Sequence, residues 1–201
     1  MKTLKFENKE DWFKARSGKI TGTRLKDIVV KRGIEEKLGF YELIAERIAI
    51  PPDGEDPMER GSRLEETAIK RFSKETGKKV NTELVIWERE DNPNIAVSPD
   101  GFIGKTEAID AKCLSSSRHI QAFITQTIPD EYYFQFLQYF IVNDQLKTLY
   151  VAFYDDRVTV KEFFYLEMKK KDYEEEIQKY LEYQKEKLEK VEEIVKELTK
   201  F

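Results

Sequence analysis

Cysteine and histidine are almost absent from this sequence, which has one of each, Cys113 and His119, among 201 residues. A single cysteine rules out an internal disulfide, a four-cysteine iron–sulfur cluster and a zinc ribbon. A single histidine likewise rules out a histidine-rich zinc site. If the protein is an enzyme, its chemistry therefore depends mainly on carboxylates and lysines.

Glycine-rich phosphate loops and long apolar runs are also missing. The segment Gly101-Phe102-Ile103-Gly104 matches neither a Walker loop nor a dinucleotide-binding fingerprint. No apolar run reaches the length of a bilayer-spanning helix, and residues 1–7 lack the apolar stretch of a signal peptide. We therefore expect a soluble, cytoplasmic protein that does not contact a membrane.

The overall charge is close to balanced. Lysine and arginine total 35 and aspartate and glutamate total 39, so the formal net charge is −4. This balance argues against a protein that coats nucleic acid generally, but it is compatible with a local basic groove. With 40% hydrophobic residues, the chain is long enough for one α/β domain with a substantial core.

Apolar periodicity predicts helices first, strands in the middle and one long helix at the end. The expected helices are residues 9–30, interrupted near Ser17-Gly18, then 35–49, 56–75, 115–123, 130–142 and 169 to the end. The expected strands are residues 79–87, 95–98, 108–113, 148–154 and 158–166. This order predicts a single α/β domain (1–201) with a central mixed β-sheet flanked by helices. It comprises a helical part (1–78), a sheet core (79–166) and a long C-terminal helix (169–199).

The C-terminal helix allows two interpretations. Large and apolar residues recur at alternating spacings of three and four from Tyr173 to Leu198, as in a coiled-coil seam between chains. The same pattern is typical of a terminal helix that packs on its own domain and exposes a charged face, and this second interpretation is favoured.

Two aspartates and a lysine in the middle of the chain are candidates for catalysis. Asp100 lies in the turn-forming segment Pro99-Asp100-Gly101, which by itself needs no function. In the strand expected at 108–113, the two-residue period places Asp110 and Lys112 on the same face. Apolar residues alternate with these charges as in an interior strand, where an unpaired charge is costly.

Glu65 is a third acidic candidate. On a helix it aligns with the apolar residues Ala68 and Phe72, whereas Glu66 aligns with Lys70 on the polar side. Such an acid is either functional or exposed at the margin of the apolar stripe. Two or three acids that converge with a lysine form an oxygen-lined site suited to Mg²⁺ or Mn²⁺, which can activate water and neutralise charge on a phosphodiester.

These motifs, in this order, resemble the PD-(D/E)xK nuclease superfamily and, more narrowly, the phage lambda exonuclease and YqaJ-type viral recombinase family. The similarity runs from Trp12 to about Tyr154. Five elements carry it, and they contain Arg16 with Gly18 and Ile20, then Gly61 with Glu65, Pro99-Asp100, Asp110-Ala111-Lys112 with Ser116-Ser117-Arg118, and Tyr133-Phe134-Gln135. The resemblance implies a restriction-endonuclease-like core with a long C-terminal helix added.

The resemblance also implies residue roles. Asp100 and Asp110 would be metal ligands with the Ala111 carbonyl, Glu65 would bind the metal or position a water, and Lys112 would activate the nucleophile. The remaining candidates would contact DNA or its terminal 5′-phosphate, and they are Arg16, Thr23, Ser116, Ser117, Arg118 and Gln135. The family's second glutamine is displaced here to Gln138, with Leu137 in its place.

The function implied is a Mg²⁺-dependent 5′-to-3′ exodeoxyribonuclease acting on linear duplex ends. It would release mononucleotides and leave 3′ single-stranded overhangs for recombination. A single-strand annealing protein as partner, a trimeric ring and a phage or prophage origin in a bacterial host also follow from the resemblance alone. Two alternatives stay open, a structure-specific endonuclease on the same fold and a catalytically inactive DNA-binding or assembly module.

Three further features have ordinary structural interpretations. His119 is expected at the surface and Cys113 as a small buried residue. The aromatic residues of 132–140 can stack on a frayed base, but core packing explains most of them better.

Overall fold

Four strands from the middle and C-terminal parts of the chain form a mixed sheet. In spatial order they are β4 (Gly101–Ile103), β5 (Glu107–Lys112), β6 (Thr148–Tyr154) and β7 (Phe163–Lys169). β5 and β6 are parallel, while the two outer pairs are antiparallel. The computed structural model describes residues 1–30, 37, 39–40, 43, 59–114, 116–156, 158 and 161–200, without the side chains of 59–63 and 116–118. The predicted mixed sheet flanked by helices is confirmed.

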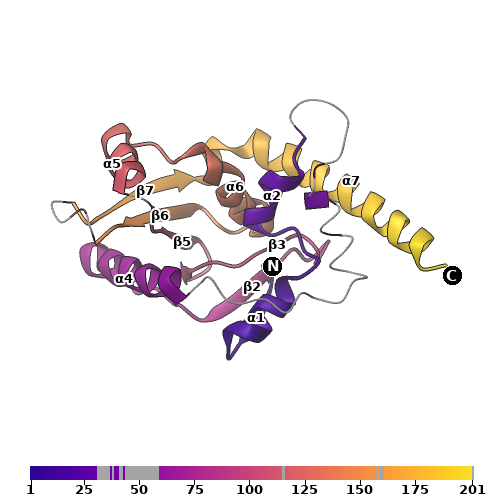
Figure 1. Cartoon of the computed structure of the whole chain (residues 1–201), viewed down its shortest axis with the longest axis horizontal. Coiled ribbons are helices and arrows are strands. Elements are labelled where there is room, and N and C mark those ends of the chain that lie inside the picture. The colour runs from indigo at the N-terminus through magenta and orange to yellow at the C-terminus, as the bar shows by residue number, and fades with distance from the viewer. Residues whose placement is uncertain are drawn as a thin grey trace.

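Helices cover both faces of this sheet (Figure 1). On one face lies α4 (Glu59–Thr76), whose Phe72 ring is 4.9 Å from the ring of Tyr150 in β6. On the other face, α6 (Tyr133–Val142) shares a large apolar core with the strands. All seven residues of β6 are buried, because this central strand is covered on both faces.

A second, three-stranded sheet contains a strand that the sequence pattern did not predict. β1 (Lys2–Phe6) pairs antiparallel with β2 (Leu84–Glu88), which pairs in turn with β3 (Ala96–Val97). The part that was expected to be helical, residues 1–78, therefore also contains a strand. The apolar signal of β1 is weak, because this edge strand leaves most of its side chains exposed.

The interruption predicted near Ser17-Gly18 is confirmed, and it ends α1 (Lys9–Arg16) before α2 (Gly22–Ile28) begins. Gly18 adopts a φ of 70°, a conformation that glycine tolerates without steric cost. Ile20 then forms a parallel bridge with Ile95, next to β3. The chain that follows α1 is thereby held against the segment that leads into Asp100. The helix expected at 35–49 lies almost entirely outside the described residues.

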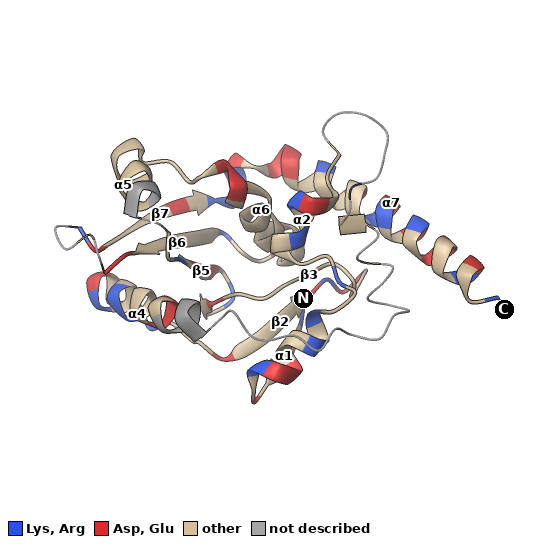
Figure 2. Cartoon of the chain, in the orientation of Figure 1, with Lys and Arg blue, Asp and Glu red and all other residues tan. Residues whose placement is uncertain are grey.

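The C-terminal half contains α5 (Ser116–Thr125), the short helices η1 (Asp130–Tyr132) and η2 (Lys170–Asp172), and α7 (Glu174–Leu198). α7 packs against α6 and then extends away from the body of the molecule (Figure 1). Its four buried residues are Leu181, Gln184, Leu188 and Val191. These contacts, together with the charged residues of both signs along α7 (Figure 2), agree with the favoured interpretation, a terminal helix that packs on its own domain and exposes a charged face.

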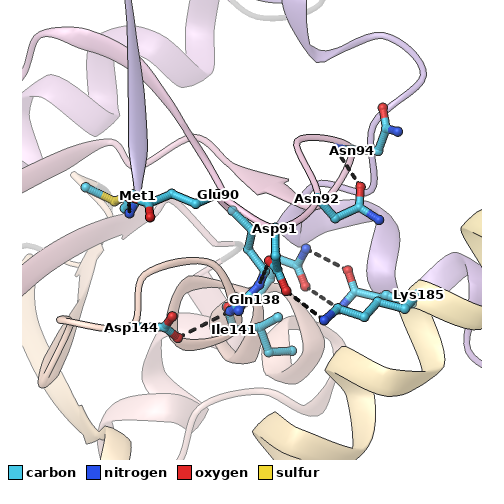
Figure 3. A network of polar contacts seen from close by, with 11 residues as sticks. Met1, Glu90, Asp91, Asn92, Asn94, Gln138, Ile141, Asp144 and Lys185 are labelled. Carbon is cyan, nitrogen blue, oxygen red and sulfur yellow. Dashed lines mark hydrogen bonds and ion pairs between the residues drawn. The ribbon is translucent and has the colours of Figure 1, made fainter.

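A polar network fastens α6 and α7 to the turn between β2 and β3 (Figure 3). Arg89 Nε donates to Asp91 Oδ1 at 2.7 Å, and its Nη1 donates to the Ile141 carbonyl and, at 3.2 Å, to Asp144. Lys185 on α7 reaches Asp91 Oδ2 at 2.7 Å. The hydrogen bond from Arg89 and then that from Lys185 lower the pKa of Asp91 to about 2.

Among the described helices, none combines the length and the apolar composition needed to cross a membrane.

Candidate active site

β5 carries the central pair of charges. Its alternation places Ile109 and Ala111 against α4 and turns Asp110 and Lys112 toward α6, as the two-residue period predicts. The Asp110 carboxylate is 1% exposed and the Lys112 side chain 13%, and the two form a direct ion pair. A charged pair at this depth in the sheet requires further polar partners.

Two residues of α6 supply those partners for Asp110. Gln135 Nε2 donates to Asp110 Oδ2 at 3.0 Å, and the Tyr139 hydroxyl donates to the same oxygen at 2.8 Å. Gln135 was a predicted site residue, whereas Tyr139 was attributed to core packing. Its position four residues after Gln135, on the same side of one helix, was the signal that could have identified it.

Asp100 approaches the same centre from the turn before β4. Its Oδ2 accepts a hydrogen bond of 2.7 Å from the Ala111 backbone N–H, and its Oδ1 has no hydrogen bond among the described residues. Burial, reinforced by the charge of Asp110, raises the pKa of Asp100 to about 8. Asp100 and Asp110 therefore converge as predicted. The positive charge of Lys112 only partly compensates the repulsion between their carboxylates.

Lys112 lies over the rings of Tyr132 and Phe136, with Nζ 5.1 and 5.3 Å from their centroids. Burial by itself lowers the pKa of Lys112, but the charges of Asp110 and Asp100 more than offset this effect, so the pKa is raised. The negative charges of Asp110 and Asp100 therefore keep the Lys112 side chain protonated.

Glu65 lies on α4, partly buried, on the helix face that also carries Ala68 and Phe72, as predicted. Burial raises its pKa, while Lys112 lowers it and Asp110 raises it, so all three charges act on one another. Glu65 forms no hydrogen bond with Asp100 or Asp110 among the described residues. Its role as a metal ligand or water-positioning residue stays a prediction.

Arg16, at the end of α1, is close enough to the same centre to be affected by its charges. Its guanidinium stacks on the Trp12 ring at 4.6 Å. Burial lowers the pKa of Arg16, and the charges of Tyr139 and Asp100 act against this effect. Thr23 is exposed, and its hydroxyl lies 3.3 Å from that of Thr21. The structure thus brings Arg16 within electrostatic range of Asp100 and leaves Thr23 exposed to solvent.

Gly22 allows α2 to approach α6 at the position of Gln135. A Cβ at residue 22 would lie 2.8 Å from the Gln135 backbone oxygen and 3.2 Å from its Cγ. Because the first of these atoms belongs to a helix backbone, it cannot move aside cheaply. Glycine at this position therefore helps to place Gln135 beside Asp110.

The predicted residues of α5 are only partly placed. Ser116, Ser117 and Arg118 form the first turn of α5, which begins four residues after Lys112, but their side chains lie outside the described part. The expectation that His119 lies at the surface is wrong. His119 is fully buried. Its Nε2 donates to the Lys161 carbonyl at 2.8 Å, and its ring packs on Phe164.

The donor set of this centre suits a hard divalent cation. Within the part of the chain that the structure describes, no three Asp, Glu, His or Cys side chains converge as a preformed metal cage. Mg²⁺ does not require one, because it is usually held by one or two carboxylates, retained waters and substrate oxygens. Asp100 and Asp110 provide two carboxylates, and the Asp100 oxygen without a hydrogen bond is available to such an ion.

We expect the contribution of Asp100 to stability in EDTA to fall as the pH rises from about 4 to 8. The pKa of Asp100 is raised from 3.8 to about 8, so over this range the folded state retains a proton that the unfolded chain has released. Urea titrations at several pH values measure the effect, and Asp100→Asn should flatten the profile. Added Mg²⁺ should stabilise the protein more at pH 8 than at pH 5. A stability difference between wild type and Asp100→Asn that stays constant over this range would contradict the assignment.

Comparisons with known proteins identify the family and the fold. A family model described as the YqaJ-like viral recombinase domain matches residues 11–146, which include every candidate site residue. Among curated proteins, none matches the chain significantly. The solved structure of an alkaline exonuclease, LHK-Exo, from Laribacter hongkongensis is 26% identical, with a TM-score of 0.79 over 94% of this chain and 95% of that chain.

Two further solved structures are similar. LHK-Exo in complex with dAMP has a TM-score of 0.78 at 26% identity, over 94% of this chain and 95% of that one. A phage-related exonuclease from Haemophilus somnus 129PT shares the fold, with 13% identity and a TM-score of 0.60 over 90% of this chain and 96% of that chain. Because the family model spans more than half of the chain, this protein belongs to the YqaJ-like viral recombinase family.

Proposed function

We propose that this protein is a Mg²⁺-dependent exodeoxyribonuclease that degrades one strand of linear duplex DNA from its 5′ end. Membership of the family and similarity to an alkaline exonuclease support a nuclease, which is a hydrolase. The observation that carries the proposal is the centre formed by Asp100, Asp110 and Lys112, in which two carboxylates and an amine meet beside Gln135.

Asp100, Asp110 and the Ala111 carbonyl would hold the metal, with Glu65 nearby. The ion would supply Lewis acidity, which lowers the pKa of water and neutralises charge that develops on a phosphodiester. Gln135 and Tyr139 fix the orientation of the Asp110 carboxylate by their hydrogen bonds. Held in this way, Asp110 presents its oxygens in one geometry and needs no rearrangement during the reaction.

Lys112 would position and deprotonate the attacking water. In the absence of other cations, the carboxylates of Asp110 and Asp100 hold the proton on Nζ. Once their charge is compensated, burial becomes the dominant influence, and burial lowers the pKa of an amine. The same side chain is then able to accept a proton from water at neutral pH.

Arg16 would bind the terminal 5′-phosphate, and this contact is the basis for proposing 5′-to-3′ polarity, mononucleotide products and 3′ overhangs. Its guanidinium stacks on Trp12, and its pKa is affected by the charge of Asp100. A guanidinium can form two parallel hydrogen bonds with a phosphate, which a lysine ammonium cannot. By family likeness we also propose action with a single-strand annealing protein, and self-association.

Arg16→Lys should reduce the preference for 5′-phosphorylated over 5′-hydroxyl ends by about tenfold or more, because a bidentate charge-assisted contact is lost. The measurement is the ratio of kcat/KM for two linear duplexes that differ only in the 5′ group. Lys14→Arg, on the exposed side of the same helix, is the matched control and should leave the ratio unchanged. An unchanged ratio in Arg16→Lys would place the end-recognition site elsewhere.

The test of the proposed function uses end-labelled linear duplex and closed circular plasmid, each with Mg²⁺ and with EDTA. Mg²⁺-dependent loss of linear DNA only, absent in Lys112→Ala, is the expected result. Cleavage of the circle would retain the metal centre but identify an endonuclease. No hydrolysis with Mg²⁺ or Mn²⁺ would refute the enzyme and leave a DNA-binding module.

A further inference from the structure

A lysine-rich cleft of about 650 Å³ lies at the end of the four-stranded sheet where β6 begins and β7 ends. Its walls come from the segment after α6, from the start of β6 and from η2 with the first residue of α7. The charged residues that line it are Lys147, Lys169, Lys170, Lys171, Asp144 and Glu174.

Four lysines and two acids line the cleft. Lys169 pairs with Glu167 at 2.5 Å and Lys170 donates to a backbone carbonyl, whereas the other two ammonium groups are unpaired among the described residues. Asp144 accepts a hydrogen bond from Arg89 at 3.2 Å (Figure 3), and Glu174 lies in the first turn of α7, where the helix dipole favours an acid. Lys147 and Lys171 are exposed and have no carboxylate partner within the described residues. The cleft is therefore locally positive in a chain of negative net charge.

Lys170 is held in place at the centre of this group. Its Nζ donates to the Asp144 carbonyl at 2.9 Å, and its backbone N–H donates to the Lys147 carbonyl at 3.0 Å. Burial lowers the pKa of Lys170, so its surroundings do not fully satisfy the charge. The segment 144–147 and η2 are thus joined by backbone and side-chain bonds, and the lysines project from a fixed frame.

The cleft lies a short distance from the catalytic centre along the same elements. Asp110 is in register with Val151 and Leu166, and Thr148 with Lys169, three residues farther along the strands. At ~3.3 Å per residue this separation is roughly 10 Å. Positions three apart on a strand point to opposite faces, so Lys169 points away from the face that carries Asp110, and the cleft lies at the end of the sheet, separate from the catalytic centre.

We propose that the lysine-rich cleft binds the phosphodiester backbone of DNA outside the scissile position. The inference rests on the proposed nuclease function and adds a second phosphate contact to it. Lysine ammonium groups are point charges without the fixed fork of a guanidinium, so they suit sequence-independent backbone binding. The displaced single strand and the intact duplex both present a row of phosphates, and either one can occupy the cleft.

The test replaces the two exposed lysines in Lys147→Gln/Lys171→Gln and measures the affinity for fluorescent 20-nucleotide single strands and duplexes in EDTA. The matched control is Lys2→Gln/Lys74→Gln, which removes the same charge from exposed positions on β1 and α4. We expect about tenfold weaker binding at 0.1 M salt, and a slope of log affinity against log salt that is shallower by roughly 1.4 for single strands or 1.8 for duplex. The control should retain the wild-type affinity within about twofold.

The outcomes separate the possibilities. A loss confined to single strands identifies the displaced strand as the occupant, and a loss confined to duplex identifies the duplex backbone. Equal losses in both variants would show a general charge effect and overturn the proposal, as would unchanged binding in the cleft variant. If the wild-type protein binds DNA through the cleft but hydrolyses none with Mg²⁺, the proposed function fails while the cleft assignment stands.

Discussion

Replacing Asp110 by asparagine is expected to reduce hydrolysis of linear DNA by at least about 10³-fold, the scale of losing a principal electrostatic stabiliser of a transition state. Asparagine has nearly the same shape and still accepts the hydrogen bond from Tyr139. It cannot, however, neutralise Lys112 or bind a cation as a carboxylate does. Single-turnover rates with saturating Mg²⁺ measure the loss, and circular dichroism confirms that the variant is folded.

The matched control is Asp130→Asn, at an exposed position in η1, just before α6. This variant should retain the wild-type rate within about twofold. Tyr139→Phe removes only one hydrogen bond to Asp110 and should cost about 10- to 100-fold, as expected for a group that orients a metal ligand. If Asp110→Asn kept more than a tenth of the wild-type rate, the centre around β5 would not be the catalytic one.

Gln138→Leu is expected to lower the free energy of unfolding by about 3 kcal/mol, because it leaves several buried polar groups without partners. Gln138 and Gln184 are both 0% exposed and exchange two amide hydrogen bonds of 2.9 Å between α6 and α7. Gln138 Nε2 also donates to the Ile20 carbonyl at 2.9 Å and lies 3.3 Å from the Ala96 carbonyl oxygen. Urea denaturation measures the loss.

A double-mutant cycle distinguishes a specific amide pair from ordinary packing. In Gln138→Leu/Gln184→Leu both buried amides are replaced by apolar groups, so the double variant should be more stable than the sum of the single losses by about 1–3 kcal/mol. Gln178→Leu, on the exposed face of α7, should change the stability by less than about 0.5 kcal/mol. Strictly additive losses would mean that the pair is not coupled.

Features with a local cause were predictable from the sequence. The face shared by Asp110 and Lys112 follows from strand alternation alone, and the boundary at Ser17-Gly18 follows from a glycine with positive φ. The stripe on α4 is equally local, since Glu66 pairs with Lys70 on the exposed side while Phe72 is buried. In each case the decisive neighbours lie within a few residues along the chain.

Features that depend on distant contacts were missed. His119 is buried because residues 161 and 164, more than 40 positions later, close over it. Tyr139 becomes a site residue only because the sheet brings Asp110 beneath α6. β1 and β4 are short strands whose pairing partners supply most of their stabilisation, so their own sequences carry little signal.

Asp110, proposed as a metal ligand, and Arg16, proposed to bind the DNA end, belong to parts of the molecule that bury very different amounts of side chain. β6 is paired on both sides and buried throughout, whereas α1, which carries Arg16, has no fully buried residue. Amide hydrogen exchange should therefore be slow in β5 and β6 and fast in α1, which can open locally without disturbing the sheet. Under the proposed roles, substitutions in α1 would alter which DNA ends are accepted while the centre around β5 stays intact, so end preference and chemistry could evolve separately.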